Sequence, residues 1–129
     1  MSGAPATLPR SARVRTQRDF RRAYQRGQRA TGQWLTVVVC ATTAGAGLRV
    51  GLSVSKDHGG AVRRNKLKRL LREAFRLERA AFAGDLDLVL IPRVRADDFP
   101  LAALRAELVQ LVARARSKGG SDRRPRRRP

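Results

Sequence analysis

The stretch AVRRNKLKRLLREAFR, residues 61–76, combines a helical apolar repeat with a dense block of cations. At about 100° per residue, apolar and basic side chains fall on opposite sides of a helix. The apolar stripe consists of Leu67, Leu70, Leu71, Ala74, Leu77 and Ala81, and the polar stripe of Asn65, Lys68, Arg69, Arg72, Arg76 and Arg79. The pattern predicts an amphipathic helix, continuing to about Phe82, that packs on a core and presents a cationic face.

The charge of the chain is extreme for its size and is concentrated in segments. Its 129 residues carry a formal net charge of +19, which disfavours a compact state unless a polyanion supplies counter-charge. Eight Arg and one Asp lie in residues 10–29, eight basic and two acidic side chains in 61–80, and six basic and one acidic in 117–129. The composition is typical of a small, single-domain nucleic-acid-binding protein.

Several other classes of function are disfavoured by composition. One cysteine, Cys40, and one histidine, His58, cannot make an internal disulfide or an ordinary zinc site. Cys40 is expected to be buried as a small apolar residue, and Asp85 and Asp87, at a turn, are expected to cap or to be solvated. No run reaches the roughly 18 apolar residues of a membrane span, and no secretory signal is visible. We therefore expect a cytoplasmic protein with no membrane partner.

The remaining elements can be placed from caps and periodicity. Thr16 is predicted to cap a helix that ends at Gly27, with Asp19 in the capping-box position. Phe20 and Tyr24 share one face of this helix, where core packing and stacking on a base are both open readings. Strands are predicted at 34–40 and 48–55, paired as an antiparallel hairpin, and at 86–91. Pro100 opens a last amphipathic helix.

The predicted order α-β-β-α-β-α is an α+β, two-layer sandwich. The strand at 48–55 alternates, so Arg49, Gly51, Ser53 and Ser55 share a small, polar face that can stay partly open. The predicted organisation is a disordered N-terminal extension (1–12), one domain (13–116) and a disordered basic tail (117–129).

The segment from Lys56 to Arg76 resembles the signature of the bacterial ribonuclease P protein subunit. The matching residues are Gly59, Ala61, Val62, Arg64, Asn65, Lys66, Leu67, Lys68, Arg69, Arg72, Glu73, Ala74, Phe75 and Arg76. The strand LRVGLSVS at 48–55, Asp19-Phe20 with Tyr24 and Gly27, and Asp87-Leu88-Val89 fit the same family. The resemblance covers roughly residues 13–112.

The resemblance implies an α-β-β-α-β-α sandwich with a mixed sheet and a left-handed βαβ crossover, a ribosomal S5 domain 2-like fold. The general rule for crossovers favours the right hand, so the handedness comes from the resemblance alone. It also implies a subunit of an endoribonuclease whose RNA partner is the catalyst and removes the 5′ leader of precursor tRNA. By the same resemblance, the protein is expected to bind the leader and the catalytic RNA. It is expected to bind no cofactor alone, the Mg²⁺ being held mainly by RNA, and to need no obligate protein partner.

Site residues follow position by position from the resemblance. RNA binding is expected at Arg64, Asn65, Lys66, Lys68, Arg69 and Arg72, and a leader-binding cleft at Phe20, Tyr24, Val38, Lys68 and Arg72. No residue is expected to be catalytic or to bind a metal.

The chain departs from the family pattern at four positions. Lys66 replaces an Arg and loses the bidentate fork, and Val38 stands where many members have an aromatic residue. By alternation Trp34 lies on the same strand face as Val38, so it either replaces the missing aromatic residue in the cleft or packs in the core. Asp57 stands at a position that is usually basic, and Gly60 at one that is usually Asn.

Two alternatives fit less well. A generic small basic RNA-binding or ribosomal protein explains the composition, but not the ordered Arg-Asn-Lys helix or the aromatic pair. A protein-only nuclease needs clustered carboxylates to hold metal, whereas the acidic residues here are scattered.

Overall fold

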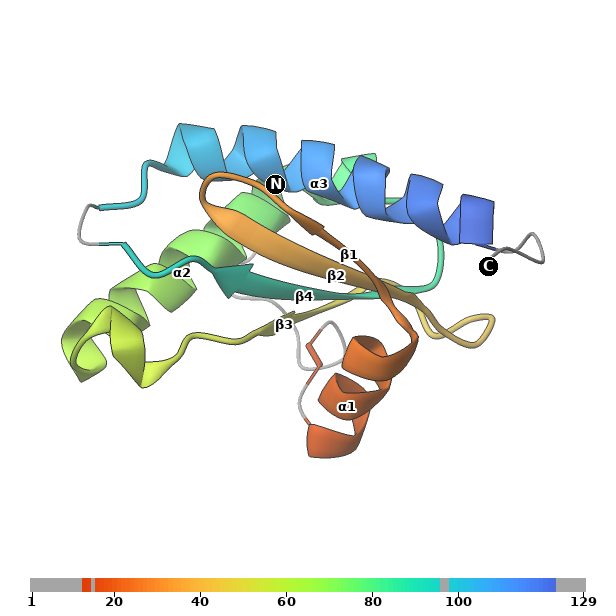
Figure 1. Ribbon diagram of the computed structural model, residues 1–129, viewed down its shortest axis with the longest axis horizontal. Coiled ribbons are helices and arrows are strands. Elements are labelled where there is room, and N and C mark those ends of the chain that lie inside the picture. Colours follow the sequence, from red (N-terminus) through yellow and green to blue (C-terminus); the bar gives the residue numbers. More distant parts are fainter. Residues whose placement is uncertain (1–12, 15, 96–97, 123–129) are drawn as a thin grey trace, which may run out of the picture.

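A computed structural model describes residues 13–14, 16–95 and 98–122 of the chain. Within these residues the strands are β1 (Gln28–Thr31), β2 (Leu35–Ala41), β3 (Arg49–Leu52) and β4 (Leu86–Pro92). The helices are α1 (Gln17–Arg26), α2 (Ala61–Glu78) and α3 (Leu101–Asp122), with short 3₁₀ segments η2 (Lys56–His58) and η3 (Arg79–Ala81). Helices α2 and α3 lie on one face of the sheet and α1 on the other (Figure 1). The predicted α+β sandwich is confirmed.

The helix boundaries follow the local signals in the sequence. At α1 the Thr16 hydroxyl accepts the N–H of Asp19 at 3.1 Å, and Gly27 ends the helix. The amphipathic helix α2 ends at Glu78 and is continued by η3. The last helix starts after Pro100 as predicted but continues to Asp122, beyond residue 116. The predicted extension at 1–12 and the end of the tail, 123–129, lie outside the described residues.

The predicted antiparallel hairpin between the strands at 34–40 and 48–55, which correspond to β2 and β3, is wrong. Strand β4 lies between β2 and β3, antiparallel to β2 and parallel to β3, so the sheet is mixed and α2 forms the crossover from β3 to β4. The physical reason is that β4 is an apolar run buried on both faces, which suits a central strand better than an edge. The sequence also failed to predict β1, a short edge strand in which Ala30 is the buried residue.

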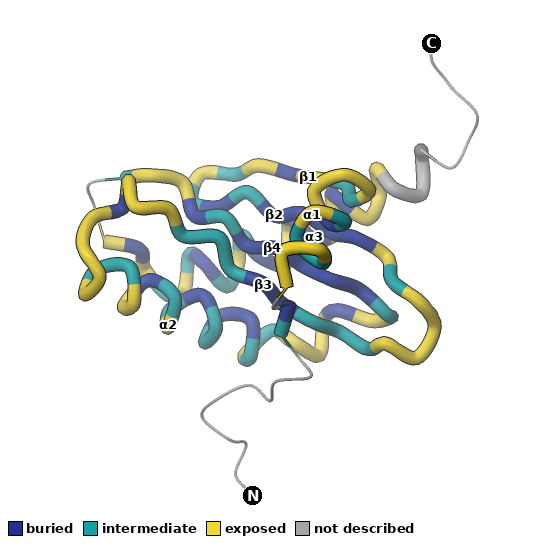
Figure 2. Tube along the Cα trace, turned by 90° about the horizontal axis from the view of Figure 1, so that it is seen from below, coloured by how far each residue is buried: buried dark blue, intermediate teal, exposed yellow. Residues whose placement is uncertain are grey.

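The main core fills the space between the sheet and the two helices α2 and α3. Its fully buried side chains include Leu71, Phe75, Leu88, Leu90, Leu104 and Leu108. A smaller cluster under α1 contains Ala23, Val38, Cys40 and Val89. Figure 2 shows the contrast, with buried residues along β2 and β4 and a mostly exposed α1. Cys40 is buried as predicted, and this burial, aided by the Asp87 charge, raises the pKa of its thiol.

The carboxylate of Glu107 ties α3 to the turn between β1 and β2. It accepts backbone N–H groups from Gln33 at 2.8 Å, Trp34 at 2.6 Å and Leu35 at 2.7 Å. A Cβ on Gly32 would lie 2.5 Å from the carboxyl carbon of Glu107. The turn therefore needs glycine at this position so that the carboxylate can reach the three amides.

Asp87 is fully buried in β4, and the prediction that it caps or is solvated is wrong. Its carboxylate accepts a bidentate pair from Arg49, at 2.7 Å from Nε and 2.6 Å from Nη2, and lies 3.4 Å from Arg22 of α1. Asp19 of α1 pairs with the same two arginines, at 3.2 and 3.4 Å. Asp85 is half-buried and accepts the N–H of Gly47 at 2.8 Å, so it links the turn before β4 to the loop between β2 and β3 instead of capping its own turn. The Asp87 network therefore fastens α1 to the sheet.

Replacing Asp87 with Ala is expected to lower the free energy of unfolding by about 3 kcal/mol, because it leaves partly buried arginines without their counter-charge. Urea unfolding followed by circular dichroism measures the change. The matched control is Asp57→Ala, which removes the same charge from an exposed residue of η2 and should cost less than about 0.5 kcal/mol. Equal losses in the two variants would show that the buried network does not hold the fold.

Candidate nucleic-acid interface

Two adjacent hollows form one open groove between α1 and α2, with β3 as the floor. The first, of about 290 Å³, is lined by Arg13, Val14, Phe20, Val50, Gly51, Leu52, Lys68 and Arg72. The second, of about 490 Å³, is lined by Gln17, Phe20, Arg21, Tyr24, Gln25, Leu52 and Ser53. They share Phe20 and Leu52, and we call them together the α1–α2 groove. Gly51 and Ser53 belong to the small, polar strand face that was predicted to stay partly open.

The α1 side of the groove is aromatic. The rings of Phe20 and Tyr24 lie 6.4 Å apart at an interplanar angle of 31°. Phe20 is half-buried against the sheet, whereas the Tyr24 side chain is exposed. A Cβ on Gly51 would lie only 2.8 Å from two ring carbons of Phe20, so the ring rests directly on the strand backbone. The core-packing reading holds for Phe20, which packs on the sheet while one side of it lines the groove, and stacking on a base stays a prediction.

The opposite side of the groove is cationic. Lys68 and Arg72 are one helical turn apart on α2, and Arg13 faces the same hollow. Among the described residues no carboxylate pairs with any of these three side chains, and the Nε of Arg13 is buried without a hydrogen-bond partner. Burial first, and then the charge of Arg13, lower the pKa of Arg72. Cations held together without acids form a site that favours an anion.

The other predicted RNA-binding residues lie on different parts of α2. Asn65, Lys66 and Arg69 are exposed to solvent. Arg64 is half-buried and its Nε donates to the Gly59 carbonyl at 3.2 Å, which holds the side chain over the loop before the helix. The structure thus brings two of the six predicted residues, Lys68 and Arg72, into the groove and leaves the other four outside it.

Two strand residues lie elsewhere than the cleft. Val38 was predicted to line it, but it is only 1% exposed and packs beneath α1 with Ala23. It therefore supports the groove wall and is not accessible from the groove. Trp34 precedes β2 and packs on the main core, with Phe99 at 5.7 Å and the guanidinium of Arg95 4.2 Å above its ring. The core reading of Trp34 is confirmed, and it adds no ring to the groove.

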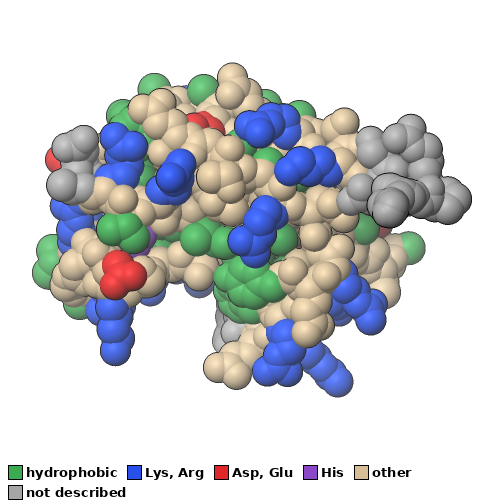
Figure 3. Space-filling view, in the orientation of Figure 1, with side chains coloured by type: hydrophobic (Ala, Val, Ile, Leu, Met, Phe, Trp, Pro, Cys, Tyr) green, Lys and Arg blue, Asp and Glu red, His purple; other side chains and the backbone are tan. Residues whose placement is uncertain are grey.

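Arg13 and Arg21 are groove residues that sequence reasoning missed. Arg13 forms an isolated parallel β-bridge with Val50, and the N–H of Val14 donates to the Val50 carbonyl at 2.8 Å, so the segment before α1 runs along β3. No local sequence pattern predicts this contact. Arg21 follows Phe20 on α1, and the only sequence feature that pointed to it as a binding residue was the dense basic segment at 10–29. In Figure 3, Lys and Arg side chains are spread over the visible face and lie at its lower edge on both sides of the notch, and few acidic side chains are visible.

The groove is suited to binding. Among the residues that the structure describes, no acidic side chain lines either hollow. Across the described residues, no three His, Cys, Asp or Glu side chains lie close enough to hold a metal ion. No helix in that part of the chain is long and apolar enough to cross a membrane. An aromatic wall facing unpaired cations is the arrangement that grips single-stranded nucleic acid.

Comparisons of the sequence give one consistent family. A family model described as Ribonuclease P matches residues 8–116. The chain is 34% identical over 111 residues to the ribonuclease P protein component of Finegoldia magna, an alignment that covers 86% of this chain and 96% of that protein. It is 39% identical over 118 residues to that of Desulfovibrio desulfuricans, covering 88% and 91%.

Solved structures agree with the sequence comparisons. The RNase P protein of Staphylococcus aureus matches with a TM-score of 0.69 at 30% identity, covering 81% of this chain and 94% of that one. The RNase P protein of Thermotoga maritima matches with a TM-score of 0.69 at 30% identity, covering 79% and 96%.

Replacing Gly51 with Ala is expected to push Phe20 off the floor of the groove and to destabilise the fold by about 1 kcal/mol through overpacking. The added Cβ would also lie 2.9 Å from the Cβ of Val14, which cannot move as easily as a ring. Thermal unfolding and the chemical shifts of the Phe20 ring protons measure the two effects. Gly60→Ala, where the added Cβ meets no atom within 4 Å, is the control for the ring shifts and should leave them unchanged. Unchanged ring shifts in Gly51→Ala would contradict the close approach.

Proposed function

The chain belongs to the ribonuclease P protein family, and we propose that it binds the 5′ leader of precursor tRNA in the α1–α2 groove. It acts as the protein subunit of ribonuclease P. The observation that carries the leader assignment is the groove itself, with Phe20 and Tyr24 on one side and Lys68, Arg72 and Arg13 on the other. We propose further that the exposed side of α2, with Asn65, Lys66 and Arg69, binds the catalytic RNA subunit.

The groove is matched to a single strand and not to a duplex. An unpaired strand exposes base faces to an aromatic side chain while its phosphates contact cations on the other side. Phe20 is held by the sheet and keeps its orientation without RNA, whereas the exposed Tyr24 is free to adjust to the base. Mature tRNA has no 5′ leader to place here. The groove therefore supplies affinity for the precursor that the product lacks.

Hydrolysis is assigned to the RNA subunit. The carboxylates of Asp19, Asp87, Glu73, Glu78 and Glu107 are all engaged with arginines or backbone amides, and none lines the groove. We propose that Mg²⁺ in the holoenzyme is held mainly by RNA and supplies the activated water. No obligate protein partner is proposed, and the cytoplasm is the proposed location because precursor tRNA is the substrate.

Cleavage assays test the proposed function directly. Precursor tRNA is incubated at low Mg²⁺ with the purified protein, with the cognate catalytic RNA, and with both. We expect no cleavage by the protein alone and a large gain in rate when the protein joins the RNA. Cleavage by the protein alone would overturn the assignment of catalysis to RNA. A lack of any gain would favour the alternative of a generic small RNA-binding protein.

Replacing Arg72 with Ala is expected to weaken binding of leader-bearing tRNA by about tenfold, the scale of one charged hydrogen bond. Binding of mature tRNA should change less than twofold. The slope of log affinity against log salt should flatten by about 0.7, as expected for one lost phosphate contact on a single strand. Fluorescence titrations of the holoenzyme with both tRNAs measure these values.

The matched control is Arg114→Ala, which removes the same charge from an exposed position on α3, outside the groove. It should reduce both affinities alike and only slightly. If Arg72→Ala also reduces both affinities alike, Arg72 contributes general RNA affinity and the leader does not lie in the groove.

A further inference from the structure

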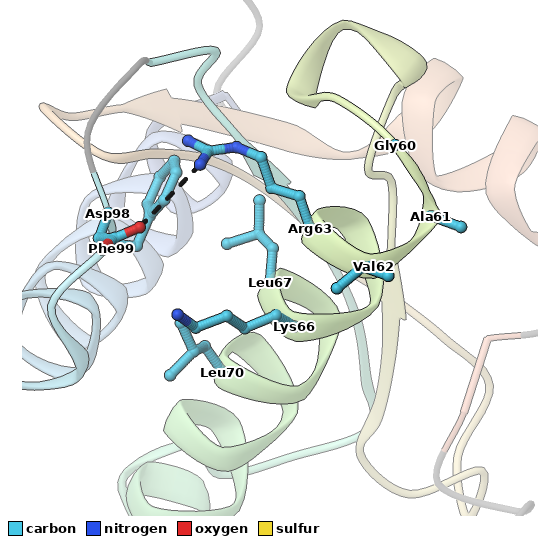
Figure 4. A pocket seen from close by; sticks show the side chains of 9 residues that line it. All are labelled: Gly60, Ala61, Val62, Arg63, Lys66, Leu67, Leu70, Asp98 and Phe99. Atoms are coloured by element: carbon cyan, nitrogen blue, oxygen red, sulfur yellow. Dashed lines mark ion pairs between the residues drawn. The ribbon is translucent and has the colours of Figure 1, made fainter.

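A third hollow, of about 610 Å³, lies on the other side of α2 from the α1–α2 groove. Val62, Lys66, Leu67 and Leu70 line it from α2, and Asp98 and Phe99 line it from the segment that leads into α3 (Figure 4). We call it the α2–Phe99 hollow. Residues two apart in a helix point about 200° apart, which is why Lys66 and Lys68 face different cavities.

The walls of this hollow are largely apolar and reach the surface. Val62 is 85% exposed, the highest value among the large apolar side chains of the described residues that are exposed. Leu70 is half-buried, while Leu67 and Phe99 close the floor. An exposed apolar surface beside a cavity marks a binding site more often than a surface of scattered apolar residues does.

The mouth of the hollow favours an anionic partner. Lys66 is exposed and no described carboxylate pairs with it. Asp98 is the one acidic residue among the described residues of the lining, and it lies 4.0 Å from Arg63, which balances its charge. The hollow also reaches the start of α2, where Gly60 provides no side-chain cap and the first backbone N–H groups carry partial positive charge. A partner that combines an apolar face with negative charge fits these features.

Among macromolecules, RNA has that combination, because each nucleotide joins an apolar base face to a phosphate. We propose that the α2–Phe99 hollow holds an unstacked nucleotide of the catalytic RNA subunit. The base lies over Leu67 and Leu70, and the phosphate lies against Lys66. This inference rests on the proposed function. Lys66 connects the two, since it belongs both to the exposed RNA-binding side of α2 and to the lining of the hollow.

The location also separates the two RNAs. The leader groove uses the side of α2 that carries Lys68 and Arg72, and the hollow uses the side that carries Lys66 and Leu70. With the leader on one side of α2 and the catalytic RNA on the other, the helix separates the substrate from the catalyst. A contact in the hollow should therefore change affinity for the catalytic RNA without changing the preference for a leader.

The test replaces Val62 with Glu and, as a matched control, Val94 with Glu. Both valines are exposed, at 85% and 58%, and Val94 does not line the hollow, so both variants should fold, as circular dichroism will verify. We expect Val62→Glu to weaken binding of the catalytic RNA about tenfold, the scale of losing one held base. Val94→Glu should change it less than twofold. Val62→Gln, which adds no charge, should still weaken binding about threefold.

Chemical modification of the RNA provides the second readout. With wild-type protein, at least one base of the catalytic RNA should become protected from dimethyl sulfate, and Val62→Glu should restore its reactivity while Val94→Glu does not. Equal affinity losses for the two Glu variants, an effect of Glu without any effect of Gln, or no protected base would each overturn the proposal.

Two further outcomes would also overturn it. A fall in the preference for leader-bearing tRNA with unchanged affinity for the catalytic RNA would assign the hollow to the leader. A change of molecular mass in light scattering with unchanged RNA affinity would assign it to a second copy of the chain. If wild-type protein neither binds the catalytic RNA nor stimulates cleavage, the proposed function itself fails. That result is distinct from all of these.

Discussion

A buried carboxylate cannot stay charged in a protein interior unless cations and hydrogen bonds surround it. Asp87 meets this condition through the bidentate contact from Arg49 on the parallel neighbour strand and through Arg22 on α1. Arg49 and Asp87 are register partners, so the pair also marks the correct alignment of β3 with β4. Because Arg22 and Asp19 join the same network, they fix the position of α1 on the sheet. The position of α1 in turn fixes Phe20 and Tyr24, the aromatic side of the groove.

Local signals in the sequence were sufficient for the helices and insufficient for the sheet. Each local signal depends only on residues close together in the sequence. Examples are the Thr16 cap, the stripe through Leu67 and Leu71, and the apolar run of β4. Strand order depends instead on contacts between distant segments, and β4 joins the sheet between two strands that precede it. The edge strand β1 contributes one buried residue, Ala30, which is too little to produce a visible alternation.

The side of a helix on which a site residue lies could be predicted from the sequence. Whether a strand residue is exposed could not, because that depends on which element packs over the sheet. The spacing showed that Lys68 and Arg72 share one side of α2 and that Phe20 and Tyr24 share one side of α1. Their assignment to one cleft came from the family resemblance. Val38 alternates correctly toward the face that carries α1, yet α1 lies directly over it and removes it from the surface. Arg13 reaches the groove through a bridge to Val50 that no local pattern encodes.

The uneven pairing of charges distinguishes the part of the chain that folds from the part that binds. The described acidic residues are largely used inside the structure: Asp87 and Asp19 hold α1, Glu78 pairs with Arg105, and Glu107 holds the turn before β2. Few are left to neutralise the cations on either side of α2, where Arg13 and Arg72 even oppose each other's charge. That repulsion disfavours the compact state of the free protein, and a bound polyanion would relieve it. The described carboxylates therefore stabilise the fold, and the RNA proposed to bind here would supply the counter-charge that a net charge of +19 leaves unmet.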